Sequence, residues 1–187
     1  LYLSRCPDVI NAQEGFFDVE SVWPKLEQAL RQAISNLVAM RETEGSNIYG
    51  DFIKRADLIA EKLAVIEERS PQVVEEYQIR LSDRINELLA KHNQVIEPER
   101  LLQEVAIFAD RTSITEEIIR LKSHIKQFRL IIDADQPVGR KLDFLIQEFN
   151  REANTIASKA NDYTLAQVVV EIKAEIEKIR EQIQNIE

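Results

Sequence analysis

EEIIRLKSHIKQFRLII, residues 116–132, already indicates the fold class of this chain. Its apolar residues return every three or four positions, which is the spacing of one face of an α-helix. They are Ile118, Leu121, Ile125, Phe128 and Ile132. A second stripe of Glu117, Arg120, His124 and Gln127 runs beside that face. The predicted helix therefore holds an acid, a guanidinium and an imidazole next to a core seam, either as surface groups or as part of a site.

Helical periodicity continues on both sides of this stretch, and capping residues predict where each helix begins. We expect helix starts at Ser21 and Ser70 as capping hydroxyls, with Pro71 at the first helical position after Ser70. Pro98 is expected to open another helix. Thr115, followed by two glutamates at the positive end of the helix dipole, is expected to cap the helix quoted above.

The sequence indicates some connections between the predicted helices more strongly than others. Gly45 is either a break or a tolerated residue within one long helix, and the helix that starts at Ser70 is expected to end near His92. The sequence DADQPVG at 133–139 is the clearest turn. It precedes a helix over about 138–160 and a last helix from about Thr164. That last helix has apolar residues at a spacing of about 3.5 residues, as in a coiled coil.

These patterns predict an all-α fold, namely an elongated bundle of long antiparallel helices and helical hairpins. We divide the chain into an irregular tail at residues 1–20, a long-helix region at 21–97 and a C-terminal helical domain at 98–187. The chain begins with Leu1 rather than Met, so we expect it to be part of a longer protein.

Composition and charge narrow the classes of protein. No apolar run approaches the roughly 20 residues that span a bilayer, and the single cysteine, Cys6, excludes an internal disulfide. We therefore expect a cytoplasmic protein without a membrane partner. The net charge of −9 argues against general coating of nucleic acid, and no DNA partner is predicted. Residues 110–160, with nine basic and eight acidic residues, are the least acidic part of the chain.

Candidate residues for chemistry lie on the polar flanks of three consecutive predicted helices. Neither histidine belongs to an H-E-x-x-H or E-x-x-H motif, and no Gly-rich phosphate loop is present. The first group is Glu104, Asp110 and Arg111, and the second is Glu117, Arg120 and His124. The third group is Arg140, Lys141, Asp143, Glu148, Arg151, Glu152, Asn154 and Lys159.

Helix geometry separates what these candidates can do. Glu117 and His124 are two turns apart, about 10 Å, which is too far to share one metal ion without a partner helix. Glu148 and Glu152 are one turn apart, about 6 Å, and two carboxylates at that spacing suit a hard divalent cation with waters. An imidazole from the facing helix would then be a ligand or a general acid and base.

A simpler interpretation applies to the same residues. Glu116–Arg120, Asp143–Lys141 and Glu148–Arg151 are spaced as solvated surface ion pairs, each contributing about a few tenths of a kcal/mol. A lone histidine beside a core seam is commonly a hydrogen-bonded structural residue. Periodicity alone therefore predicts a helical domain and does not predict its function.

Three long motifs add a family resemblance. They are EVAIFADRTSITEEIIRLKSHIKQF at 104–128, GRKLDFLIQEFNREANTIASKAND at 139–162 and VVEIKAEIEKIREQIQNIE at 169–187. Together with RETEGSNIYGDFIKR at 41–55, they resemble the C-terminal region of the YicC/YloC family of bacterial endoribonucleases. The likeness is strongest from Glu104 to Glu187 and weaker over residues 36–100.

The resemblance implies a function and an assembly. It implies cleavage of single-stranded RNA with a divalent metal, Mn²⁺ or Mg²⁺, in the cytoplasm. It also implies a β-rich N-terminal portion that precedes this chain, with residues 1–10 as its tail. Homo-oligomers are implied as well, with a hexamer as the expected form, and the isoleucine-rich last helix is a candidate either for assembly or for bracing the preceding hairpin.

The polar residues that match the family motifs include Asn150, to which no role is given. The roles expected of the others are inferred from what RNA cleavage needs. Phosphate-binding residues are expected to be Arg111, Arg120, Arg140, Lys141, Arg151, Asn154 and Lys159. Catalytic and metal-binding residues are expected to be His124, Glu117, Glu148 and Glu152, with Glu104, Asp110 and Asp143 as weaker metal candidates. Two alternatives stay open: a helical assembly module that clamps RNA without cutting it, and a coiled-coil scaffold with no role in RNA binding.

Overall fold

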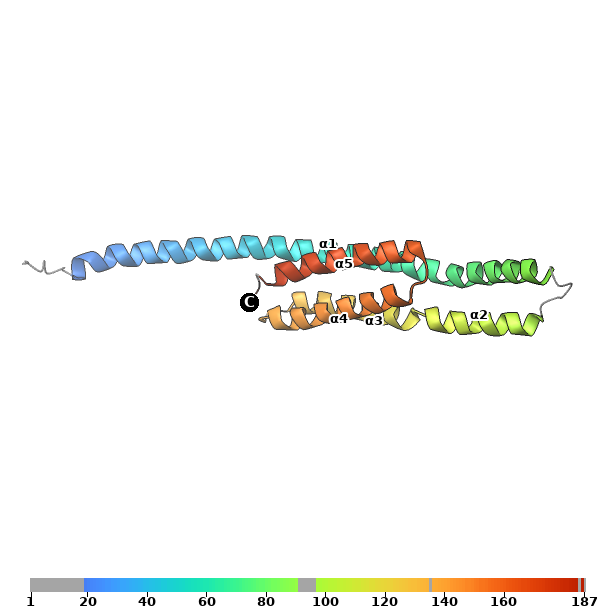
Figure 1. Cartoon of the computed structure of the whole chain (residues 1–187). Helices are drawn as coiled ribbons and strands as arrows, with labels where there is room; N and C mark the ends of the chain where they lie inside the picture. The colour runs from blue at the N-terminus through green and yellow to red at the C-terminus, as the bar shows by residue number, and fades with distance from the viewer. Residues whose placement is uncertain (1–18, 91–96, 135, 185, 187) are drawn as a thin grey trace, which may run out of the picture. The chain divides into compact units, whose positions relative to one another are not determined.

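The computed structural model describes residues 19–90, 97–134, 136–184 and 186. Its helices are α1 (Val19–Ala90), α2 (Pro98–Thr112), α3 (Thr115–Ile132), α4 (Gly139–Lys159) and α5 (Tyr163–Ile183) (Figure 1). The described part contains no strand, which confirms the predicted all-α class. None of the described helices combines the length and the apolar character that crossing a lipid bilayer requires.

The chain divides into two units, residues 1–46 and 47–187, and α1 contributes to both. In the first unit the described residues are helical and bury no side chain. Their apolar stripe is about half exposed; it consists of Val22, Trp23, Leu26, Leu30, Ile34, Leu37 and Val38. The three-part division predicted from the sequence stays a prediction.

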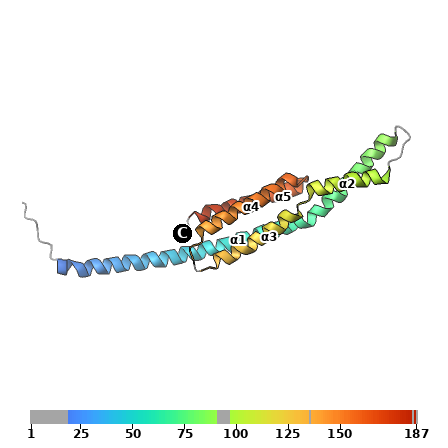
Figure 2. The same ribbon diagram turned by 90° about the horizontal axis from the view of Figure 1, so that it is seen from below.

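In the second unit, α3, α4, α5 and the middle of α1 form a four-helix bundle (Figures 1 and 2). Within the bundle, α4 runs antiparallel to α3 and α5 runs antiparallel to α4, and the connections after α3 and α4 are short. Each helix presents apolar residues at steps of three and four, such as Phe52, Ala56 and Ile59 on α1. These side chains are almost fully buried in one core with Phe128 of α3 and Phe149 of α4.

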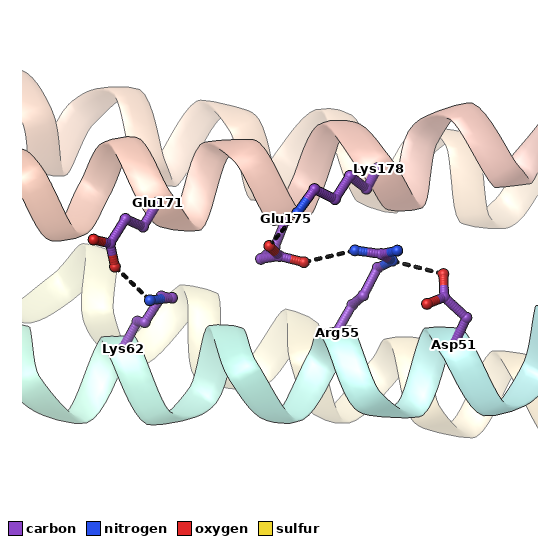
Figure 3. A network of polar contacts seen from close by, with 6 residues as sticks. All are labelled: Asp51, Arg55, Lys62, Glu171, Glu175 and Lys178. Atoms are coloured by element: carbon purple, nitrogen blue, oxygen red, sulfur yellow. Dashed lines mark hydrogen bonds and ion pairs between the residues drawn. The ribbon is translucent and has the colours of Figure 1, made fainter.

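The bundle is closed by ion pairs that link α1 to its neighbours. Arg55 of α1 donates through Nη1 to Glu175 Oε2 of α5 at 2.7 Å and through Nε to Asp51 at 2.6 Å (Figure 3). Lys62 pairs with Glu171 further along the same two helices. On the other side, α3 reaches α1 through Lys122–Glu67 and Arg129–Asp57. Together with the packing of α3 on α4 and of α4 on α5, these pairs show that the helices follow the order α1, α3, α4, α5 around the core.

The second unit also contains a hairpin between the end of α1 and α2. Here Tyr77 and Phe108 stack with ring centroids 3.6 Å apart and planes 8° apart, and Val105 of α2 is buried. α2 begins at Pro98, as predicted, and Pro98 is tolerated at this first helical position because the missing N–H would have no helical partner there. The expected helix end at His92 lies outside the described residues.

The predicted helix start at Ser70 and Pro71 is wrong, because α1 continues through both residues and through Gly45. A proline inside a helix removes one backbone hydrogen bond. Contacts on both sides of Pro71 offset that loss. Ile66 and Val73 are buried in the core, and Arg69 donates to the carboxylate of Glu76 and, at 2.8 Å, to Asp162 ahead of α5.

Two capping predictions are also wrong, although the helices themselves are present. α1 already includes Val19 and Glu20, so Ser21 is not its cap; an acid at position 20 suits the positive end of the dipole. Thr115 is the first residue of α3, and Ile114 holds the capping position without a side-chain hydrogen bond. Burial of Ile114, only 1% exposed, fixes this start in place of a hydroxyl.

The turn and the last two helices follow the prediction closely. Residues 133–138 connect α3 to α4, whose bounds lie within one residue of the predicted 138–160. α5 starts at Tyr163, and Asp162 caps it by accepting a hydrogen bond from the backbone N–H of Leu165 at 2.9 Å. The apolar face of α5 is buried in this bundle through residues such as Ile172, Ile176 and Ile179, so it braces the α3–α4 hairpin.

Candidate functional site

The α3–α4 hairpin positions the polar residues singled out in the sequence. Its inner seam includes Leu121, Ile125 and Phe128 on α3, which meet Leu145 and Phe149 on α4. Phe128 and Phe149 lie with ring centroids 5.9 Å apart. Since the apolar seam fixes the rotation of both helices, the residues on its flank face each other across the hairpin.

The structure brings His124 of α3 together with Glu148 and Glu152 of α4. One ligand atom from each of the three side chains lies within 4.8 Å of the others. We call these three residues the His–Glu cluster. Glu152 is 3% exposed, whereas His124 and Glu148 are half-buried, so the cluster lies at the edge of the core and opens to solvent on one side.

The donor set of the His–Glu cluster fits a divalent cation. One imidazole and two carboxylates suit Mn²⁺, and the carboxylates alone suit Mg²⁺. His124 Nδ1 is buried and has no hydrogen-bond partner, and its ring lies against Phe149 at a centroid distance of 6.3 Å. The part of the chain that the structure describes contains one group of at least three His, Cys, Asp or Glu side chains with ligand atoms this close together, and that group is the His–Glu cluster.

Cationic side chains partly balance the two carboxylates of the cluster. Arg120 Nη1 lies 3.8 Å from Glu152 Oε1, while its Nη2 pairs more closely with Glu116. Arg151 Nη1 lies 3.6 Å from Glu148 Oε2 and is 70% exposed. Two of the predicted surface pairs therefore exist as contacts, alongside the cluster. Both arginine side chains are about half exposed or more, so an anion at this edge can reach them.

Glu117 stands apart from the cluster. It is 5% exposed, and its Oε1 accepts a hydrogen bond from Lys159 Nζ at 2.7 Å, while its Oε2 is buried without a partner. Burial opposes ionisation of Glu117, but the hydrogen bond and charge of Lys159 outweigh it and hold the pKa of the carboxyl below its ordinary value. The contact ties the start of α3 to the end of α4.

An open groove of about 400 Å³ runs between α3 and α4 and ends at the cluster. His124 and Glu148 form one end, and Arg140 and Lys141, in the first turn of α4, line the same groove. The other lining residues are Gln127, Ile131, Phe144 and Leu145. A negatively charged ligand in this groove would thus meet two cationic side chains together with the cluster.

The remaining predicted residues lie outside the cluster and groove. Glu104, Asp110 and Arg111 are exposed on α2. Asp143 is exposed on α4 and accepts a hydrogen bond from Gln147 at 3.0 Å in place of the predicted pair with Lys141. Asn154 is exposed on the same helix. Their predicted metal and phosphate roles stay predictions.

Phe144 is the groove residue that the sequence analysis missed. It is 65% exposed, whereas the neighbouring apolar residues Leu142 and Leu145 are buried. A signal was present: Phe144 falls outside the seam and lies three residues after Lys141 and four before Glu148, so it shares their flank of the helix.

Comparison with known proteins identifies relatives over the whole chain. The profile described as "Endoribonuclease YicC-like, C-terminal" matches residues 66–187, and "Endoribonuclease YicC-like, N-terminal region" matches residues 2–50. The chain is 48% identical over 185 residues to the "Probable endoribonuclease YicC" of Clostridioides difficile. It is 37% identical over 183 residues to the protein of the same name from Haemophilus influenzae.

These alignments cover 99% and 98% of this chain. They cover 63% and 62% of the respective relatives, so the chain spans somewhat less than two thirds of the length of either protein. The C-terminal match includes α2 to α5 and therefore the His–Glu cluster and the groove.

Proposed function

Since this chain belongs to the family of YicC-like endoribonucleases, we propose that it carries the phosphodiester-cleaving site of a metal-dependent endoribonuclease acting on single-stranded RNA. The observation that carries this proposal is the His–Glu cluster at the end of a groove with two cationic side chains. The names of the relatives support RNA cleavage in general, and the donor set supports the metal.

In this proposal His124, Glu148 and Glu152 hold one Mn²⁺ or Mg²⁺ ion. When bound, such an ion neutralises charge on the phosphate and lowers the pKa of a water that can act as nucleophile. Arg140 and Lys141 bind phosphates of the RNA, with Arg120 and Arg151 next to the cluster stabilising the charge that develops on the cleaved phosphate. The Glu117–Lys159 pair joins α3 to α4 at the end of the hairpin opposite the turn.

We also propose that the protein is homo-oligomeric and cytoplasmic. A hexamer is the form implied by the family resemblance. The exposed apolar stripe at residues 22–38 leaves surface for such assembly, whereas the apolar face of α5 is buried within the bundle. Light scattering on the purified chain, compared over a range of concentrations, measures the oligomeric state directly.

The first prediction concerns cleavage. An end-labelled single-stranded RNA is expected to be cut with Mn²⁺ and not with EDTA. His124→Ala, Glu148→Gln and Glu152→Gln are each expected to lower the rate more than about a hundredfold, because each removes a direct metal ligand. Glu61→Gln, which changes an exposed acid on α1, is the matched control and is expected to keep the rate.

A second readout separates a metal site from a merely structural role of the cluster. Mn²⁺ is expected to raise the midpoint of thermal unfolding of the wild type and of Glu61→Gln, but not of Glu148→Gln or Glu152→Gln. RNA binding without cleavage by this chain and by the C. difficile relative would instead support the RNA-clamp alternative. Full activity of a folded His124→Ala variant would overturn the proposal.

A further inference from the structure

We propose that the groove between α3 and α4 binds a single unpaired nucleobase, stacked on the ring of Phe144 beside the His–Glu cluster. The inference rests on the proposed function, since it names the part of an RNA that this site recognises. It adds a base-binding element to a site otherwise built from charged and metal-binding side chains.

The first step is the placement of Phe144. Single exposed apolar residues are common on protein surfaces and need no explanation by themselves. Phe144 differs because it lines the groove that also contains Arg140, Lys141 and Glu148. At 65% exposure its ring is available to a ligand, whereas Phe128 and Phe149 of the same hairpin are fully buried in the core.

The second step is the spacing along α4. Arg140 and Lys141 precede Phe144 by one helical turn, and Glu148 follows it by one turn. A turn rises about 5.4 Å, so a phosphate-binding group, an aromatic ring and a metal ligand follow each other along one flank of the helix. A nucleotide bound along this flank would place its base at the ring and one neighbouring phosphate at Arg140 and Lys141, while its other phosphate would approach Glu148 through the metal ion of the proposed site.

The third step is the chemistry of the groove. Every nucleobase has a flat apolar face, and aromatic side chains in single-strand-binding proteins stack on that face. Ile131 and the buried Leu145 add apolar surface beside Phe144. Gln127, on the α3 side, offers an amide donor and acceptor to a base edge. The volume of about 400 Å³ lies within the range of small-ligand pockets, of about 300–1,000 Å³.

The consequence is a substrate class. A base can stack on Phe144 only if it has left its own helix, because paired bases already stack on their neighbours. The inferred substrate is therefore RNA with an unpaired nucleotide next to the bond that is cut. A duplex would reach the charged groups through its phosphates but would leave Phe144 without a partner.

The test measures binding with EDTA present, so that it does not depend on cleavage. The probes are an unstructured oligoribonucleotide and a fully abasic counterpart with the same sugar–phosphate charge. Phe144→Ala is expected to weaken binding of the first probe about 5- to 150-fold, converted from about 1–3 kcal/mol per stacked base. Phe144→Ala is expected to leave binding of the abasic probe unchanged. Phe144→Trp, which keeps an aromatic ring, is expected to bind the base-containing probe about as tightly as the wild type.

Tyr163→Ala is the matched control, because Tyr163 is an aromatic residue, 77% exposed, at the start of α5. Equal binding of the base-containing probe by wild type and Phe144→Ala would overturn the inference, as would equal weakening for both probes. Metal-dependent cleavage that persists in that case would leave the proposed function intact. A base-dependent effect of Phe144 without any metal-dependent cleavage would support the inference and overturn the proposed function.

Discussion

At the scale of the residue, the Glu117–Lys159 contact shows how a polar side chain is accommodated within an apolar seam. The carboxylate of Glu117 is nearly buried, so its charge requires a partner, and Lys159 provides one from the far end of the neighbouring helix. The side chain of Lys159 is 36% exposed, which lets the ammonium keep part of its hydration. The pair stabilises the hairpin while leaving the His–Glu cluster free of this lysine.

The pair predicts a pH-dependent effect of Lys159→Met. At neutral pH the variant removes the side-chain hydrogen-bond partner of the nearly buried Glu117 carboxylate, so the free energy of unfolding is expected to fall by about 1–3 kcal/mol. The folded-state pKa of Glu117 lies below its ordinary 4.5, so the stabilisation is present above that value. It is lost as the pH falls through the folded-state pKa, where the difference between wild type and variant should disappear.

Urea unfolding followed by circular dichroism across this pH range measures the difference. Lys126→Met, which replaces an exposed lysine of α3, is the control and is expected to have little effect at any pH. A destabilisation by Lys159→Met that stayed constant into acid would show that lost packing of the lysine stem, and not the charge, accounts for it.

The residues of the candidate site were predictable in type and in part in position. The four-residue spacing of Glu148 and Glu152 indicated a cation site from the sequence alone. That His124 faces them depends on the rotation of α3 against α4, which burial of residues such as Phe128 and Phe149 determines. Phe144 was missed because it falls outside the apolar seam, although its spacing from Lys141 and Glu148 places it on their flank of the helix.

At the scale of the element, α1 shows a long-range contact overriding a local signal. Serine followed by proline is a good helix start when only neighbouring residues are considered. In the fold, Arg69 reaches Glu76 across Pro71 and also reaches Asp162, far away in the sequence. The hydrogen bonds from Arg69 are the main reason that the pKa values of Glu76 and Asp162 lie below their ordinary values. The ionised form of both carboxyls is therefore favoured in the folded state. The sequence of α1 contains no pattern that predicts the contact of Arg69 with Asp162.

Pro71→Ala tests whether α1 is continuous. In the interior of a helix, alanine restores a hydrogen bond and removes a clash, so the free energy of unfolding is expected to rise by about 1–3 kcal/mol. Pro98→Ala is the matched control, because Pro98 occupies the first turn of α2, where proline costs no hydrogen bond. If both variants were neutral or destabilising in urea unfolding, Pro71 would stand at a helix start.

The helices as a class were predictable because their apolar periods are long and uninterrupted. The connection between α3 and α4 and the bounds of α4 were predictable from Pro137, Gly139 and the apolar residues at helical spacing in α4. The starts of α1 and α3 were not predictable, because α1 already includes Val19 and Glu20, and buried Ile114 holds the capping position of α3. Capping hydroxyls are thus a weaker guide here than burial.

At the scale of the whole molecule, charge is distributed unevenly. The net charge is −9, yet residues 110–160, which include α3 and α4, have a small basic excess. RNA binding by such a chain is expected to be local, because most of its surface repels phosphates. Only cations that touch the RNA contribute to counterion release.

This distribution predicts a shallow salt dependence of RNA binding. For single strands the slope of log K against log salt is about −0.7 per phosphate neutralised, so the double variant Arg140→Ala, Lys141→Ala should reduce its magnitude by about 1.4. The double variant Lys178→Ala, Arg180→Ala makes the same charge change on α5 and is expected to leave the slope unchanged. Fluorescence anisotropy at several salt concentrations with EDTA measures both slopes.

The position of the His–Glu cluster within one hairpin has a consequence for the entropy cost of forming the site during folding. His124, Glu148 and Glu152 are joined by a short connection, so the entropy lost in bringing them together is small and the site has low contact order. The hairpin is a module in this sense. Insertions between α1 and α2 lie outside the stretch of chain from His124 to Glu152, so they do not lengthen the loop that has to close to form the site.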